Sequence, residues 1–118
     1  MTGKFNDVAA VVATRDFAAA RSWYSEVIGR EPDLEPIEGV AEWQIAATAW
    51  LQLMQDHDRA GRSAVRIGVD DLAAQMAELA ELGIETGEVV VIAGLVRVVD
   101  IADPDGNEVS FVEDLGAY

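Results

Sequence analysis

Few residues in this chain have the types and the spacing that catalysis or metal binding requires. The sequence contains a single histidine, His57, and no cysteine, so thiolate catalysis, disulfides and cysteine metal sites are excluded. His57 stands in a polar, Asp-rich loop at 56–62, which indicates a solvent-exposed residue rather than a ligand or a base. The sequence also lacks a glycine-rich phosphate loop after a strand, a nucleophile elbow and a Ser/His/Asp arrangement.

Two pairs of nearby carboxylates have structural explanations. Asp70 and Asp71 fall at the expected start of a helix, where acidic side chains cap free backbone N–H groups and interact favourably with the helix dipole. Asp103 and Asp105 belong to the segment 103–107, a turn in which Pro fixes one dihedral and Gly and Asn tolerate positive φ. Neither pair therefore predicts acid–base catalysis.

The composition is typical of a small, acidic, globular protein. The chain has 118 residues, 51% of them hydrophobic, which predicts a single domain over 1–118 with a buried core. Eight basic against 22 acidic residues give a net charge of −14, which opposes nucleic-acid binding. The negative charge either keeps the protein soluble or favours a cationic ligand. No apolar stretch approaches the roughly 20 residues of a membrane span. Since the N-terminus also lacks secretory-signal features, we expect no membrane partner and a cytoplasmic location.

The first half of the chain predicts a strand, a helix and two further strands. Residues 7–14 are small, apolar or β-branched, as in a strand covered on both faces. Asp16 can cap the next helix, whose apolar face repeats at three- and four-residue steps until Gly29 ends it. After a turn-rich segment, two short strands are expected at about 41–47 and 50–55.

The second half repeats this pattern. Residues 64–69 predict a strand, and Asp71, which lies 55 residues after Asp16, caps a helix that stops at Gly83. The buried face of this helix is expected to hold Leu72, Met76, Leu79 and Ala80, and three strands should follow at about 87–92, 95–102 and 108–113. The sequence therefore predicts an α+β fold of two tandem βαβββ modules, at about 5–57 and 63–115, with the helices outside the sheet.

Three groups of residues resemble the vicinal oxygen chelate superfamily across nearly the whole chain. They are Asp16-Phe17, Trp23-Tyr24 and Val27-Ile28-Gly29 in the first half, Val69-Asp70-Asp71-Leu72 in the second, and the closing segment 103–113, which begins Asp-Pro-Asp-Gly-Asn. This superfamily includes glyoxalase I, methylmalonyl-CoA epimerase, extradiol dioxygenases, fosfomycin-resistance enzymes and bleomycin-resistance binding proteins. The resemblance implies a curved, cup-shaped mixed sheet that encloses a small-molecule site.

The resemblance also implies where a metal would bind, and the residues there do not fit. Metal-dependent members use four His, Glu or Gln side chains inside the cup, because a ligand must offer a lone pair. The equivalent positions on the first strands of the two modules are Ala9 and Ala64, and that on the last strand is Ser110. Gln52 is a fourth, isolated donor. We therefore predict no metal, no cofactor and no catalytic residue of the metal-dependent kind.

Strand alternation, with those positions marking the inward faces, predicts what lines the cup instead. The candidate ligand-binding residues are Trp43, Trp50, Gln52, Met54, Arg66, Glu108 and Ser110, beside the former metal-ligand positions Ala9, Ala64 and Ser110. Trp43 and Trp50 either stack on a planar guest or serve as core or dimer contacts. Arg66 either clamps a carboxylate, phosphate or carbonyl, or pairs with Glu108 or another carboxylate.

The leading hypothesis is a metal-free binding protein similar to the bleomycin-resistance branch. It would sequester an antibiotic or another toxic metabolite without modifying it, and the guest would be cationic or planar aromatic. Members of that branch are dimers, so we expect a homodimer. The alternative is a glyoxalase- or dioxygenase-like lyase or isomerase acting in the same cup, independent of metal, with Arg66 polarising a carbonyl and Glu108 as general base.

Overall fold

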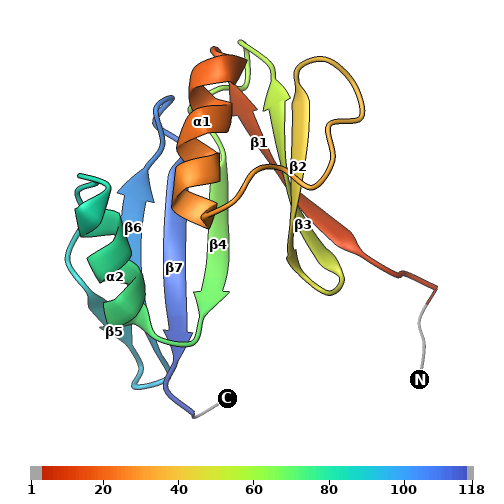
Figure 1. The fold of residues 1–118 in the computed structure, drawn as a ribbon. Coiled ribbons are helices and arrows are strands. Elements are labelled where there is room, and N and C mark those ends of the chain that lie inside the picture. The colour runs from red at the N-terminus through yellow and green to blue at the C-terminus, as the bar shows by residue number, and fades with distance from the viewer. Residues whose placement is uncertain (1–3, 117–118) are drawn as a thin grey trace.

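The computed structural model describes residues 4–116, which form two helices and seven strands (Figure 1). The strands are β1 (Val8–Thr14), β2 (Val40–Ala46), β3 (Ala49–Gln55), β4 (Ala64–Val69), β5 (Val90–Ile92), β6 (Val96–Ala102) and β7 (Glu108–Asp114), and the helices are α1 (Phe17–Ile28) and α2 (Leu72–Glu81). The predicted α+β class is confirmed. Neither of the described helices combines the length and apolarity that a membrane span needs.

The strands form two mixed sheets whose order repeats. The first sheet has the order β1-β3-β2 and the second β4-β7-β6-β5. In each module the first strand lies parallel to the last one, and the last lies antiparallel to the strand before it. A parallel neighbour requires a crossover connection, and each of these two connections contains a helix. The repeated topology supports the duplication seen in the sequence, and Figure 1 shows the three-stranded sheet splaying away from the four-stranded one.

The two helices begin and end as their capping residues predict. The Asp16 carboxylate accepts a hydrogen bond from the backbone N–H of Ala19 at 3.2 Å, and Asp71 accepts one from Ala74 at 3.0 Å. Each bond satisfies a donor that the first turn of a helix leaves free. Helix α1 ends at Gly29, whose φ of 90° lies in the left-handed region that glycine adopts without steric cost.

After α1, the predicted turn-rich segment forms only one bridge, between Leu34 and Glu42, because Pro32 and Pro36 have no N–H to donate to a ladder. The first module therefore has two full strands after its helix. Two details of the prediction are wrong. In the second module, β5 covers only Val90–Ile92 and not 87–92. Ala80, expected on the buried face of α2, is exposed.

The core lies between the sheets and the helices and draws side chains from both modules. Its largest fully buried members are Trp43, Tyr24, Leu51, Leu53 and Leu79. Strand alternation decides which residues reach it. Thus Leu51 and Leu53 of β3 are buried, whereas Trp50, Gln52 and Met54, which alternate with them, are only half-buried. The predicted alternation of this strand is confirmed.

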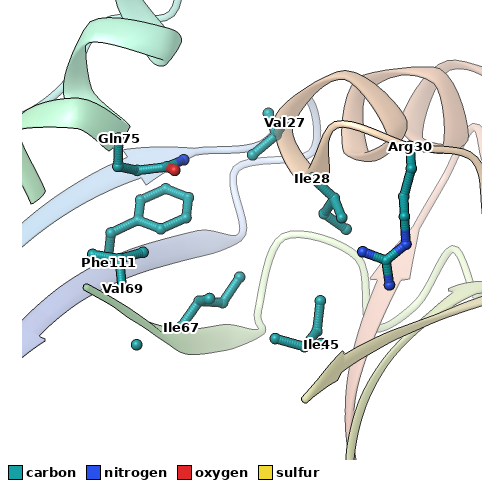
Figure 2. A pocket seen from close by; sticks show the side chains of 9 residues that line it. Val27, Ile28, Arg30, Ile45, Ile67, Val69, Gln75 and Phe111 are labelled. Atoms are coloured by element: carbon teal, nitrogen blue, oxygen red, sulfur yellow. The ribbon is translucent and has the colours of Figure 1, made fainter. Parts of the chain in front are cut away.

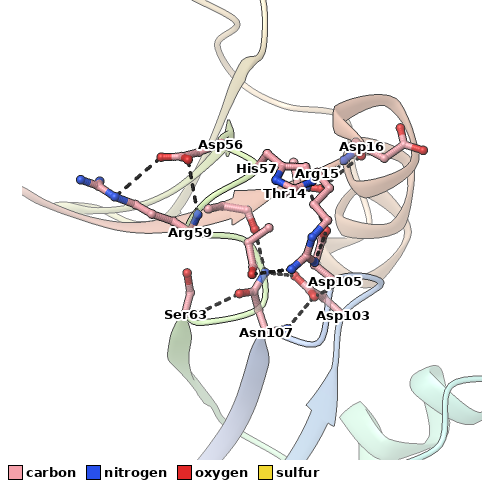
Figure 3. Close-up of polar contacts among 12 residues, drawn as sticks. Thr14, Arg15, Asp16, Asp56, His57, Arg59, Ser63, Asp103, Asp105 and Asn107 are labelled. Atoms are coloured by element: carbon pink, nitrogen blue, oxygen red, sulfur yellow. Dashed lines mark hydrogen bonds and ion pairs between the residues drawn. The ribbon is translucent and has the colours of Figure 1, made fainter.

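The Asp-Pro-Asp-Gly-Asn turn ties the second module to the first through buried hydrogen bonds (Figure 3). The Asn107 side chain donates to the carbonyl of Ala13 in β1 and to the Asp103 carboxylate, both at 2.8 Å, and accepts from the N–H of Ser63 at 2.9 Å. The Tyr24 hydroxyl of α1 donates to Asp103 at 2.7 Å. Burial and the neighbouring Asp103 carboxylate raise the pKa of Tyr24 above its usual range, so this donor stays protonated.

We predict that Asn107→Asp strongly destabilises the protein. The substitution removes the two donated bonds and places a second carboxylate beside Asp103, so the free energy of unfolding should fall by about 3 kcal/mol or more. Urea denaturation followed by circular dichroism measures the change. The control is Asn6→Asp, which adds the same charge at an exposed position and should change stability by less than about 0.5 kcal/mol. Equal effects of the two substitutions would contradict the role given to the turn.

Candidate functional site

The face of the four-stranded sheet that points away from the core forms an open cavity of about 540 Å³. Every second residue of its strands points into this cavity, while the residues between them, such as Val109 and Phe111, are buried in the core. The lining consists of Arg66, Gly68, Val90, Ile92, Val96, Val98, Asp100, Glu108, Ser110 and Val112. The second module alone therefore builds this cavity, which we call the cup face.

One end of the cup face is polar. Arg66 of β4 lies opposite Ser110 of β7, which in turn lies opposite Asp100 of β6. Ser110 is 3% exposed, and its hydroxyl donates to Asp100 at 2.6 Å and lies 3.4 Å from a Glu108 carboxylate oxygen. These residues place a cation, a hydroxyl and two carboxylates at one end of the cavity.

Arg66 is not paired with Glu108. Within residues 4–116 no carboxylate oxygen lies within 4 Å of the Arg66 guanidinium, so the interpretation of Arg66 as a structural ion-pair partner is wrong. In the strand pairing Glu108 lies opposite Ala64, one row away from Arg66, which itself lies opposite Ser110. The role of Arg66 in ligand binding stays a prediction. Its guanidinium, which has no carboxylate partner within the described residues, is available to a ligand.

The other end of the cup face is apolar. Val112 of β7 lies between Gly68 of β4 and Val98 of β6, and Val90 of β5 lies beyond Val98. Gly68 leaves a gap in this row, since a Cβ added there would meet no atom within 4 Å. The cavity therefore combines apolar walls with a few polar groups, which is the usual composition of a small-molecule site.

The predicted site residues of the first module lie on the other sheet. Trp50, Gln52 and Met54 share one side of β3, opposite the residues of β1 that include Ala9. The Gln52 amide donates to the Glu42 carboxylate at 2.6 Å. The structure thus brings Arg66, Glu108 and Ser110 together in one cavity and leaves the candidates of β3 outside it.

Trp43 is a core residue and cannot stack on a guest. Its side chain is 0% exposed, its indole N–H donates to the carbonyl of Arg30 at 3.0 Å, and its ring lies 6.2 Å from that of Tyr24. In the strand pairing Trp43 lies opposite Leu51, which is also buried. Its prediction as a ligand-binding residue is wrong, because β2 turns this residue toward the helix.

Sequence reasoning placed Gly68 on the cup side of its strand but did not find Asp100 and Glu42 as site residues. Asp100 lies opposite Ser110 in the hairpin of β6 and β7, and Glu42 lies opposite Gln52 in the hairpin of β2 and β3. Each module therefore carries an acidic side chain hydrogen-bonded to a polar one on the same pair of strands. The register across the turn at 103–107 is the sequence signal that points to Asp100.

The three positions that the resemblance predicts for metal ligands, Ala9, Ala64 and Ser110, and the possible fourth donor Gln52 do not supply a ligand set. Ala9 and Ala64 have no donor atom, and Gln52 and Ser110 are hydrogen-bonded to acidic neighbours. The part of the chain that the structure describes holds no group of three or more His, Cys, Asp or Glu residues placed to bind a metal. The side chain of His57 is 78% exposed in the loop after β3, as predicted.

A second cavity of about 200 Å³ lies on the helix side, between the two modules (Figure 2). Most of its lining side chains are apolar, and Gln75 lies beside the ring of Phe111. Arg30 lies at its edge but is held by Asp33 at 3.0 Å and by the carbonyl of Gln44. The Gln44 N–H and Arg30 lower the pKa of Asp33, which keeps this ion pair charged. Among the residues that line this cavity, the only charged side chain is Arg30, and it is already paired with Asp33.

Residues 9–112 match the family model of the glyoxalase-like domain. A solved glyoxalase/bleomycin resistance protein from Catenulispora acidiphila DSM 44928 is 36% identical, with a TM-score of 0.83 over 91% of this chain and 96% of that one. TnmS3, an antibiotic-binding protein from Streptomyces sp. CB03234, is 20% identical, with a TM-score of 0.81 over 97% and 99% of the two chains. Lactoylglutathione lyase from Agrobacterium tumefaciens is also 20% identical, with a TM-score of 0.75 over 89% and 90%. The last two likenesses show the fold alone, and no curated protein matches the sequence.

We predict that an excess of Ni²⁺, Zn²⁺, Mn²⁺ or Fe²⁺ leaves the thermal midpoint of the protein unchanged, because Ala9 and Ala64 offer no lone pair. A metal site filled at a hundred times its Kd would stabilise the fold by about 2.7 kcal/mol and raise Tm by several degrees. Differential scanning fluorimetry after treatment with a chelator measures the shift. The triple variant Ala9→His, Ala64→His, Ser110→Glu is the positive control, and a metal-dependent rise in the natural sequence would contradict the prediction.

Proposed function

The chain belongs to the glyoxalase-like domain family, within the vicinal oxygen chelate superfamily that its motifs resemble, and we propose that it binds a small organic molecule without modifying it. The cup face is the observation that carries this proposal, since it joins an apolar wall to a polar end. The residues that line its polar end include no imidazole. Sequestration of an antibiotic or another toxic metabolite is the function that such a cavity serves, and the name of TnmS3 as an antibiotic-binding protein supports it.

We propose that a homodimer completes the cup. The cup face belongs to the second module alone, and Val90 and Ile92 on it are 52% and 51% exposed. On the first sheet, Val11 is 49% exposed on the face that carries Gln52. Apolar surface of this kind is typical of an interface. The radius of gyration, 14.8 Å, also exceeds the value of about 13.5 Å expected for a compact domain of this length, which fits a chain that closes on a second copy.

The dimer proposal predicts that charges on the cup side of β5 dissociate the protein. The double variant Val90→Asp, Ile92→Asp should be monomeric in analytical ultracentrifugation at concentrations where the natural sequence is a dimer, because its carboxylates would be desolvated at the interface. Val91→Asp is the matched control, since Val91 is equally exposed on the same strand but does not line the cup face. A natural sequence that sediments as a monomer at every concentration would contradict the proposal.

The charges and the tryptophan on the two sheets support a cationic, planar guest. Glu42, Asp100 and Glu108 lie on the faces that carry the candidate residues, and the chain has a net charge of −14. Such a field attracts cations and raises their rate of encounter. Trp50 is half-buried on β3 of the first sheet, and in a cup completed by the dimer it would offer a flat indole face to the guest.

Titration with a panel of cationic natural-product antibiotics, bleomycin included, tests the proposed function. We expect saturable quenching of tryptophan fluorescence by at least one compound, and its recovery unchanged in mass after long incubation. Trp50→Ala should weaken binding about tenfold or more, as the loss of an aromatic anchor does, whereas Trp23→Phe, on α1, should not. The absence of binding across the whole panel would contradict the proposal.

A lyase or isomerase acting in the same cup is the second candidate. Arg66, free of a carboxylate partner within the described residues, can polarise a carbonyl, and the exposed Glu108 can take a proton. A guest recovered with an altered structure, and an alteration lost in both Arg66→Gln and Glu108→Gln, would favour this enzyme over the binding protein.

A further inference from the structure

The polar end of the cup face holds a positive and a negative side chain that do not form an ion pair with each other. Neighbouring strands lie about 4.8 Å apart, so Arg66 and Asp100, two strands apart, begin about 10 Å from each other. Ser110 lies between them, and its hydroxyl donates a hydrogen bond to Asp100 at 2.6 Å. Within the described residues, neither Arg66 nor Asp100 has an ion-pair partner within 4 Å.

This row of side chains discriminates against a guest with a single charge. A purely cationic head would be attracted to Asp100 and Glu108 but repelled by the Arg66 guanidinium. A purely anionic head would pair with Arg66 but would face the two carboxylates. A head that carries an ammonium and a carboxylate satisfies both ends of the row at once, because each group meets an opposite charge.

The apolar end of the cup face has room for a tail because Gly68 has no side chain. The backbone does not require glycine there, since Gly68 is absent from the glycines with positive φ and a Cβ would meet no atom within 4 Å. A larger residue would favour the strand and restrict the unfolded chain. The absence of a side chain at Gly68 therefore enlarges the apolar end of the cavity, which Val98 and Val112 border.

We propose that the guest is an amphiphile with a zwitterionic head, held with its carboxylate on Arg66, its ammonium on Asp100 and its apolar part in the gap at Gly68. This inference rests on the proposed binding function and sharpens it: the guest is cationic at one group and also carries an anion. Glu108, on the central strand β7, adds a second negative charge beside the row, since one of its carboxylate oxygens lies 3.4 Å from the Ser110 hydroxyl that donates to Asp100.

Three probes with the same tail separate the head groups. They are N-octyl-N,N-dimethylglycine, which is zwitterionic, octyltrimethylammonium, which is cationic, and octanoate, which is anionic. Isothermal titration calorimetry should give the zwitterion a Kd at least about tenfold lower than those of the other two. Arg66→Gln should remove the preference over the cation, and Asp100→Asn the preference over the anion. Arg62→Gln and Asp70→Asn, which change exposed charges that do not line the cup face, should leave the order unchanged.

Gly68→Leu tests the place of the tail. It should weaken binding of the zwitterion at least about tenfold while the thermal midpoint stays the same or rises. Equal affinity for the cation and the zwitterion, unchanged by Arg66→Gln, would overturn the zwitterionic head. Zwitterion binding that survives Gly68→Leu would overturn the orientation. If none of the three probes binds, the inferred class is overturned; the antibiotic panel then decides separately whether the proposed binding function fails with it.

Discussion

The arrangement of the two modules depends on a buried carboxylate and a buried amide at one turn. A carboxylate loses several kcal/mol of solvation when it is buried, unless hydrogen bonds replace the water. Asp103 accepts four such bonds, from the Tyr24 hydroxyl, the Asn107 side chain and the backbone N–H groups of Asp105 and Asn107. Since Asn107 also bonds Ala13 of β1 and Ser63, the residue directly before β4, the turn between β6 and β7 links these strands to α1, β1 and β4.

The same turn sets the chemistry of the cup face. It closes the hairpin of β6 and β7 with Ala102 opposite Glu108, and a ladder that starts there must place Asp100 opposite Ser110 and Val98 opposite Val112. A shift of one residue would move each of these side chains to the core side of the sheet. The separation of the cavity into a polar and an apolar end is thus a consequence of one register, and the buried hydrogen bonds of Asp103 and Asn107 maintain that register.

Local signals predicted most of the fold, and long-range pairing accounts for what they missed. Asp16, Gly29 and Asp71 act within one helical turn, so their effects are readable from the sequence. The position of Trp43 depends instead on how β2 pairs with β3, which no local pattern reveals. The same holds for Arg66, which the pairing of β4 with β7 sets opposite Ser110 rather than Glu108. The ligand itself leaves no local pattern, which is why the site could be outlined but its guest could not.

Neither the two alanines at the positions predicted for metal ligands nor the two acidic pairs provide donors that converge on one point. Ala9 and Ala64 lie on the first strand of each module and carry neither a charge nor a donor atom. The charges lie instead on the neighbouring hairpins, where Gln52 donates to Glu42 and Ser110 donates to Asp100. A metal site requires donors that converge on one point within about 2 Å of the ion. In the second module, where the cavity is formed, the polar side chains are instead spread along a row across three strands. Separate charges beside apolar walls suit an extended organic guest better than an ion.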